Sequence, residues 1–307
     1  MNSFLPEGYL FETKENQTAI HSPLSLADAF AKQQILEARA TLCDADHNLL
    51  VDLNGIRGII PRCEGAIGIA EGEVRDIAII SKVGKPVCFV ITAFETGEDD
   101  KPVIKLSRRK AQELCREEYI RNLIPGDIID CCVTHLEPFG AFCDIGCGIA
   151  SLLPIDSISV SRISHPKDRF TPGDRIKAVI RSVENGRITL SQKELLGTWC
   201  ENAELFKQGE TVSGIIRSVE DYGVFVELMP NLAGLAEPKE NVRPSQQASV
   251  YIKSIIPEKM KIKLIIIDAF DGFEQNHTPK YFYEGCHIDA WRYSPCGAGK
   301  LIATSFA

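Results

Sequence analysis

The chain has 307 residues, of which 44% are hydrophobic and 25% are charged, and its formal net charge is -8. This composition is typical of soluble globular proteins, and the length allows two or three domains. No apolar run reaches the roughly 20 residues of a membrane-spanning helix, and the first residues lack the pattern of a secretory signal. We therefore expect a cytoplasmic protein without membrane contact. Because the net charge is negative, we do not expect it to bind nucleic acid through charge alone.

Eleven cysteines are scattered through the chain, mostly inside apolar stretches, and none of them forms a CxxC pair. We interpret them as small buried hydrophobic side chains rather than as a disulfide framework. Cys286, His287 and Cys296 could be considered as zinc ligands, but their spacing matches no usual ligand pattern. We therefore expect neither a metal nor another cofactor.

Two segments of the chain repeat one another. An acidic residue, an aromatic-glycine pair and an alternating apolar strand occur at residues 137–145 and again at residues 220–228. Each segment is followed by a short alternating run, at residues 187–191 and 261–264 respectively. A weaker copy lies upstream, with residues 47–53 in place of the aromatic strand and residues 103–107 in place of the closing run. The repeat predicts three domains of one kind.

Each copy contains about five short alternating runs separated by Gly, Pro, Asn or Asp, a pattern typical of a compact antiparallel barrel. Residues 1–33 are expected to be an extension that is loop-like at first, with a helix from Leu24 to Ala40. Leu196, Trp199 and Ala203 recur at helical spacing between two copies. In chain order the prediction is an extension (1–33), a diverged barrel (34–110), a linker helix (111–123), a barrel (124–196), a linker helix (197–207), a barrel (208–270) and a C-terminal hairpin (271–307).

The faces of the strands carry the functional argument, because side chains alternate across a strand. In both strong copies one parity of the aromatic strand is wholly apolar and must face the core. This places Phe142 on the outer face beside Asp144, and Phe225 on the outer face beside Glu227. A large aromatic on an otherwise polar face, present in two copies, is not ordinary core packing.

The closing runs present cations on the same outer face. Arg187 points outward in the middle copy, and Lys261 and Lys263 point outward in the third. Outward aromatics with a nearby cation suit a single-stranded nucleic acid, because bases stack on the rings while the cation meets a phosphate. The alternative is that Phe139 and Phe142 cover a barrel edge or a seam between domains.

These residues resemble a known domain. The run Phe139-Gly140-Ala141-Phe142, the turn at residues 152–154 and the run at residues 186–191 resemble the S-one domain, named after a bacterial ribosomal protein. The third copy matches through residues 222–225, Gly234-Leu235 and Lys261. Residues 34–270 as a whole are similar to short S-one-like proteins of Gram-positive anaerobes.

The resemblance implies a mostly β chain of three tandem five-stranded oligonucleotide-binding (OB-fold) barrels, joined by short helices. It also implies RNA contacts through two aromatics, a histidine and an acid–arginine pair. Pro154 and Glu237 stand where the family has its histidine. The implied RNA-binding residues are Phe139, Phe142, Glu184 and Arg187 in the middle copy, and Tyr222, Phe225 and Lys261 in the third.

The function implied by the resemblance is binding of single-stranded RNA or mRNA in translation or mRNA handling, without catalysis. The alternative is an OB-fold protein-interaction scaffold of an RNA-handling complex that does not bind RNA directly. An RNA-processing enzyme would need a catalytic segment, and the sequence shows none. The run at residues 297–300 lacks the first glycine and the final Ser or Thr of a phosphate-binding loop.

The first copy is expected to fold but not to bind RNA. His47 and Leu50 align with the two aromatics of the other copies, and Val103 aligns with Arg187 and Lys261. Leu50 offers no ring for a base and Val103 no charge for a phosphate. Apolar side chains on an outer face are more readily buried against a protein. Residues 34–110 are therefore a candidate docking module, with the small ribosomal subunit as one candidate partner.

Overall fold

A computed structural model describes residues 4–97, 100–184, 186–271 and 279–306. The chain divides into two compact units, which we describe separately. The first unit contains Met1–Leu123, Asp130–Cys132 and Asp144–Ala150, and the second contains Ile124–Ile129, Val133–Cys143 and Ser151–Ala307.

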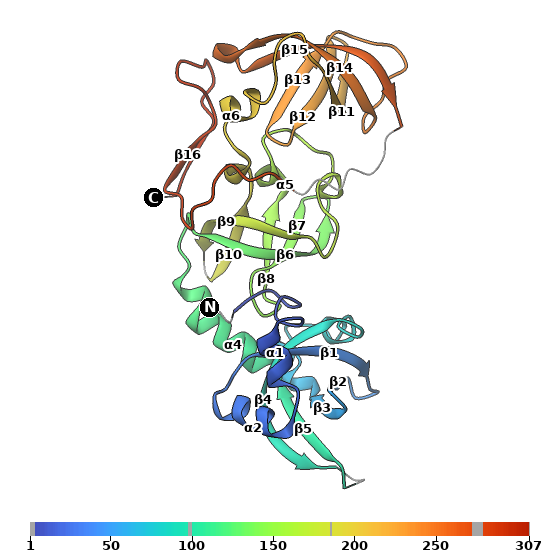
Figure 1. Cartoon of the computed structure of the whole chain (residues 1–307), viewed down its shortest axis with the longest axis vertical. Coiled ribbons are helices and arrows are strands. Elements are labelled where there is room, and N and C mark those ends of the chain that lie inside the picture. The colour runs from blue at the N-terminus through green and yellow to red at the C-terminus, as the bar shows by residue number, and fades with distance from the viewer. Residues whose placement is uncertain (1–3, 98–99, 185, 272–278, 307) are drawn as a thin grey trace. The chain divides into compact units, whose positions relative to one another are not determined.

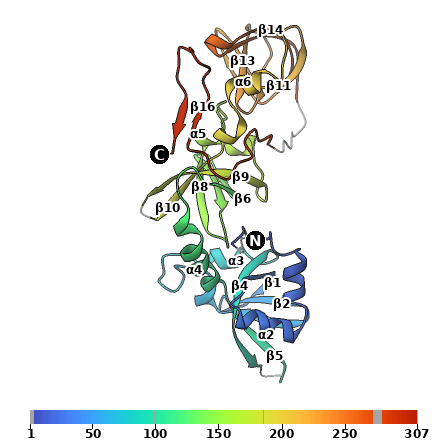
Figure 2. The same cartoon turned by 60° about the vertical axis from the view of Figure 1, so that its left-hand side comes forward.

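Three closed five-stranded barrels follow one another along the chain (Figures 1 and 2), which confirms the predicted fold class. The first barrel consists of β1 (Leu36–Cys43), β2 (Leu49–Leu53), β3 (Ile56–Ile60), β4 (Pro86–Thr96) and β5 (Pro102–Ser107). The second consists of β6 (Ile128–Glu137), β7 (Gly140–Asp144), β8 (Ala150–Pro154), β9 (Arg175–Glu184) and β10 (Arg187–Ser191). The third consists of β11 (Thr211–Glu220), β12 (Gly223–Met229), β13 (Leu232–Ala236), β14 (Gln247–Ile256) and β15 (Lys261–Phe270).

The strand pairing is the same in all three barrels. Consecutive strands pair antiparallel along most of each sheet, while the third strand pairs in parallel with the fifth. This parallel pair closes the sheet, so that each barrel has no free edge. The arrangement places the aromatic strand, the third strand and the closing strand side by side on one face.

Six short α-helices accompany the barrels in the described part of the chain. They are α1 (Lys14–Ala19), α2 (Pro23–Ala31), α3 (Ile77–Ile80), α4 (Arg108–Glu118), α5 (Ile155–Ile158) and α6 (Trp199–Ala203). The predicted helix from Leu24 to Ala40 is wrong beyond Ala31. Gln33 has a left-handed φ of 50°, which ends the helix, and Leu36 begins a strand whose apolar side chains enter the first barrel.

The N-terminal segment is part of the first unit and carries a buried ion pair. The Glu7 carboxylate lies 2.6 Å from Arg108 Nε and 2.6 Å from Lys82 Nζ. Burial raises the pKa of Glu7, but the Arg108 and Lys82 charges outweigh it and hold the pKa well below its usual range. The Glu7 amide also donates to the Asp144 carboxylate at 2.8 Å. The extension is therefore tied into the unit by charge-assisted hydrogen bonds.

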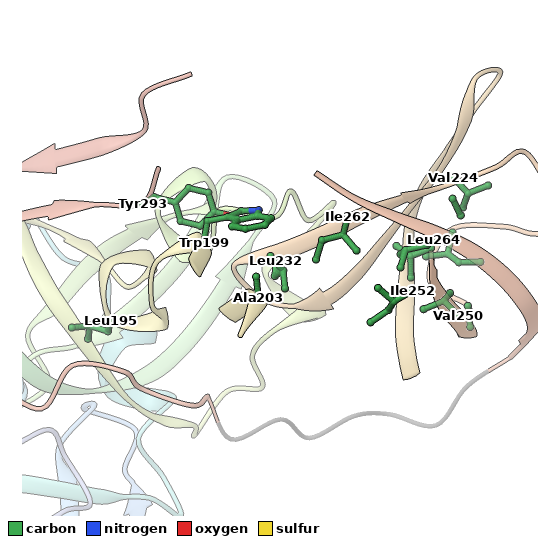
Figure 3. Packing of buried hydrophobic residues seen from close by; sticks show 14 of the residues in the cluster. Leu195, Trp199, Ala203, Val224, Leu232, Val250, Ile252, Ile262, Leu264 and Tyr293 are labelled. Carbon is green, nitrogen blue, oxygen red and sulfur yellow. The ribbon is translucent and has the colours of Figure 1, made fainter. Parts of the chain in front are cut away.

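The core of the second unit joins the third barrel to the C-terminal segment. Val224, Val250 and Leu264 point into the barrel, while Trp199 lies beside Tyr293 outside it (Figure 3). Tyr293 also donates its hydroxyl to the Asn231 carbonyl at 2.6 Å. The predicted C-terminal hairpin is confirmed as β16 (Ala290–Arg292) and β17 (Ala303–Ser305). Its aromatic residues make it part of this core.

Candidate nucleic-acid interface

Two aromatic rings stand on the outside of the second barrel. Phe139 lies in the turn between β6 and β7 with 55% of its surface exposed, and Phe142 lies on β7, partly exposed. Ala141 and Cys143, the neighbours of Phe142 along the strand, are fully buried in the core. The ring centroids of Phe139 and Phe142 lie 6.1 Å apart at an interplanar angle of 89°. This edge-to-face contact is a favoured aromatic geometry and leaves ring surface open to a ligand.

The third barrel repeats this arrangement. Tyr222 is 67% exposed in the turn before β12, and Phe225 is partly exposed on β12. Their ring centroids lie 6.2 Å apart at 87°. Two barrels of different sequence therefore hold an outward aromatic pair in almost the same geometry.

The glycine between the two aromatics is required by the approach of the neighbouring strand. A Cβ atom on Gly140 would lie 2.5 Å from the carbonyl oxygen of Leu153 on β8. A Cβ atom on Gly223 would lie 2.5 Å from the carbonyl oxygen of Ala236 on β13. Because backbone atoms cannot yield as a side chain can, only glycine fits, and the aromatic-glycine pair is a packing motif as well as a binding motif.

The acids that share a strand face with these rings are not exposed, contrary to the sequence-based expectation. Asp144 is buried, where its carboxylate accepts hydrogen bonds from the amides of Glu7, Gly146 and Gly148. Burial, and secondarily the charge of Glu7, raise the pKa of Asp144 to about 6.

Glu227 in the third barrel is buried as well. Its carboxylate lies 2.9 Å from Arg217 Nε and also pairs with Arg169. Neither acid therefore presents an exposed negative charge to a phosphate backbone.

The predicted acid–arginine pair lies where β9 ends and β10 begins. Glu184 and Arg187 are Cα partners across β9 and β10, and both side chains are exposed. Among the described residues, no ion pair engages Arg187. Its guanidinium can therefore take an anionic ligand.

The third barrel offers two exposed lysines on its closing strand, Lys261 and Lys263. The register places Phe225 opposite Leu235, and Leu235 opposite Lys263. Lys263 therefore lies in the same cross-strand row as the second ring, while Lys261 lies two residues earlier on the same face. The sequence indicated that Lys263 points outward, but only the pairing register shows that it shares this row.

His135 on β6 is a further ring that the sequence analysis missed. Its ring centroid lies 6.4 Å from that of Phe142, and the two planes differ by 26°. The imidazole Nε2 lies 2.7 Å from a Glu137 carboxylate oxygen. The family has its histidine at the position of Pro154, which lies on β8. The family motif therefore did not identify His135 on β6.

The first barrel lacks these features at the aligned positions. Leu50 is half-buried, His47 pairs with Asp76 at 3.2 Å, and Lys105 lies 3.6 Å from Glu95. Val103, at the position of Arg187 and Lys261, is only 8% exposed.

The residues that the structure describes contain neither a clustered metal site nor a membrane-spanning helix. No group of three or more His, Cys, Asp and Glu side chains is arranged to hold a metal ion. His287, one of the zinc ligands considered, instead pairs with Asp127 at 2.7 Å, and this hydrogen bond raises its pKa. Among the same residues, no helix has the length and apolar character needed to span a bilayer.

Residues 123–193 match the family described as "S1 RNA binding domain", the S-one domain of the sequence analysis, and thus include the whole second barrel. The second barrel is therefore an S1 domain.

Its relatives include the small ribosomal subunit protein bS1 of Leuconostoc lactis, 30% identical over 70% of this chain and 52% of the relative. The bS1 homolog of Bacillus subtilis is 30% identical over 74% of this chain and 58% of the relative. The chain is thus related to bacterial ribosomal protein bS1, and it spans a little over half the length of these relatives.

A solved structure of a multidomain Streptococcus pneumoniae protein with nucleic acid binding domains aligns with 80% of this chain and 76% of its own, at 13% identity and a TM-score of 0.26.

The close approach at Gly140 generates a first prediction. Gly140→Ala should lower the free energy of unfolding of the second unit by about 1–3 kcal/mol, because the added methyl group meets a backbone oxygen. Gly299→Ala is the matched control, since nothing lies within 4 Å of its added Cβ atom. Urea unfolding followed by fluorescence of Trp199 and Trp291 measures both variants. Equal stabilities for the two would contradict the packing role of the glycine.

Proposed function

We propose that this chain is a non-enzymatic, cytoplasmic RNA-binding protein that holds single-stranded RNA on its second and third barrels during translation or mRNA handling. The observation that carries the proposal is the repeated edge-to-face aromatic pair on the outside of both barrels. Bases stack on such rings whatever their identity. The names of the bS1 relatives and of the matching family support the same conclusion.

The bound strand would lie across the aromatic strand and the closing strand of each barrel. Bases would contact Phe139 and Phe142 in the second barrel and Tyr222 and Phe225 in the third. The exposed cations of the closing strands, Arg187, Lys261 and Lys263, would contact the phosphates. Glu184, which lies beside Arg187, would contact the sugars with them. Since a base must be unstacked to lie on a ring, this surface suits single strands rather than duplexes.

The first barrel would contribute a protein contact instead. Leu50 occupies the position that Phe142 and Phe225 have in the other barrels. Its Cα partner on β1, Leu42, is 50% exposed. Ile77 and Ile80 of α3 are also exposed. Apolar side chains exposed in this way favour a protein surface as partner. Because the bS1 relatives are named as small-subunit proteins, we propose the small ribosomal subunit as the partner of residues 34–110.

A protein-interaction scaffold that binds no RNA is the second candidate, and the net charge of -8 favours it. In that case the outward rings would meet a protein. The two candidates differ in a direct binding measurement.

The proposed function predicts binding of a fluorescein-labelled oligouridine and much weaker binding of an RNA duplex of equal length. Three cations that meet phosphates predict a slope of about -2 for the logarithm of the binding constant against the logarithm of salt concentration. Fluorescence anisotropy at several salt concentrations measures both quantities. The proposal would be abandoned if duplex and single strand bound equally, and the scaffold would be favoured if neither bound.

The rings themselves are tested by Phe142→Ala and Phe225→Ala. Each substitution should weaken oligouridine binding by about 1–3 kcal/mol through the loss of a stacking surface, with little loss of fold stability because each ring is outside its barrel. Leu50→Ala, at the aligned position of the first barrel, is the matched control and should leave RNA affinity unchanged. A sharp fall in melting temperature for either aromatic variant would show instead that the ring belongs to the core.

A further inference from the structure

One position on the first strand of each barrel lies opposite the second ring position, and it differs in all three barrels. In the first barrel Leu42 is the Cα partner of Leu50, and in the third barrel Ser218 is the Cα partner of Phe225. In the second barrel His135 precedes Phe142 by seven residues, as Ser218 precedes Phe225. The second barrel alone therefore has a third ring at this position.

The imidazole of His135 lies in a position to extend the aromatic surface. Its plane is within 26° of the Phe142 plane, whereas Phe139 meets Phe142 edge-on. The His135 side chain is 64% exposed, so most of the ring is open to a ligand. A ring needed only for packing would be covered by neighbouring side chains, and this one is not.

Glu137 holds the imidazole in this orientation. It follows His135 by two residues on β6, so the two side chains share one face of the strand, and its carboxylate oxygen lies 2.7 Å from Nε2. Among the described residues no hydrogen bond engages Nδ1 of His135. The ring is thus fixed at one nitrogen and has its face and its other nitrogen available to a base.

We infer that His135 is a third base-contacting ring of the second barrel, which makes this barrel a longer and tighter site for single-stranded RNA than the third. The inference rests on the proposed function and adds a residue and a ranking of the two barrels to it. Histidine stacks on unpaired bases as the other aromatic side chains do. Ser218 offers no ring in the third barrel, so the RNA would lose one stacking contact there.

Substitutions in the full-length chain test this inference. His135→Ala should weaken binding of a fluorescein-labelled oligouridine about fivefold, the lower end of the effect of losing one stacked base. His135→Phe should keep the affinity within about twofold, because it preserves a ring and loses only the contact with Glu137. Ser218→Ala is the matched control in the third barrel and should have no effect, while Ser218→His should tighten binding.

An NMR titration separates stacking from a structural role. On addition of oligoadenosine, whose purines have strong ring currents, the imidazole carbon-bound proton signals of His135 should move upfield; the His135→Phe spectrum identifies them. An unmoved signal at saturation, or unchanged affinity in His135→Ala while Phe142→Ala loses binding, would overturn the inference and leave the proposed function intact. Failure of the unmodified chain to bind either oligonucleotide would overturn the proposed function itself.

Discussion

In each barrel the third strand pairs in parallel with the fifth, and this pairing both closes the sheet and arranges the outer surface. It brings the closing strand, which follows the fourth strand after a short connection, beside the strand next to the aromatic pair. In the third barrel the result is a single row of Phe225, Leu235 and Lys263 across three strands. A ring for a base and a cation for a phosphate are thus placed in one row by backbone hydrogen bonds.

The three barrels show how one scaffold can carry different surfaces. Their cores are built alike, from alternating apolar residues on five strands, whereas the outer row changes from barrel to barrel. The first barrel has Leu50, Ile59 and Lys105 in the row, and the lysine pairs with Glu95. Such changes cost the fold little because they lie outside the core, so the proposed binding function can be lost from one barrel while its structure is retained.

The sequence predicted most of the fold, for reasons that are local. Strand alternation and the repeated aromatic-glycine pair depend on neighbouring residues, and they located the three barrels and the parity of Phe142 and Phe225. The end of α2 was missed because it depends on the backbone of Gln33, a residue that rarely adopts a left-handed φ. The RNA-binding roles of the seven residues that the family resemblance implies remain predictions.

Features of the site that depend on distant partners could not be read from the sequence. The buried Asp144 accepts a hydrogen bond from Glu7, which lies 137 residues earlier. The buried Glu227 accepts one from Arg169, which lies 58 residues earlier. Both acids therefore look exposed in a strand pattern and are not. The position of Lys263 in the row likewise depends on the register between β13 and β15. The contact between the His135 and Phe142 rings depends on two different strands lying side by side.

The central claim is that RNA lies on the outer rows of the second and third barrels and avoids the first. An NMR titration of the isotopically labelled full chain with oligouridine tests it most directly. The account predicts that the signals of Phe142, Phe225 and Lys263 shift as RNA is added, while those of Leu50 and Lys105 stay in place. Shifts concentrated on Leu50 and Lys105, with the two phenylalanine rings unaffected, would contradict it.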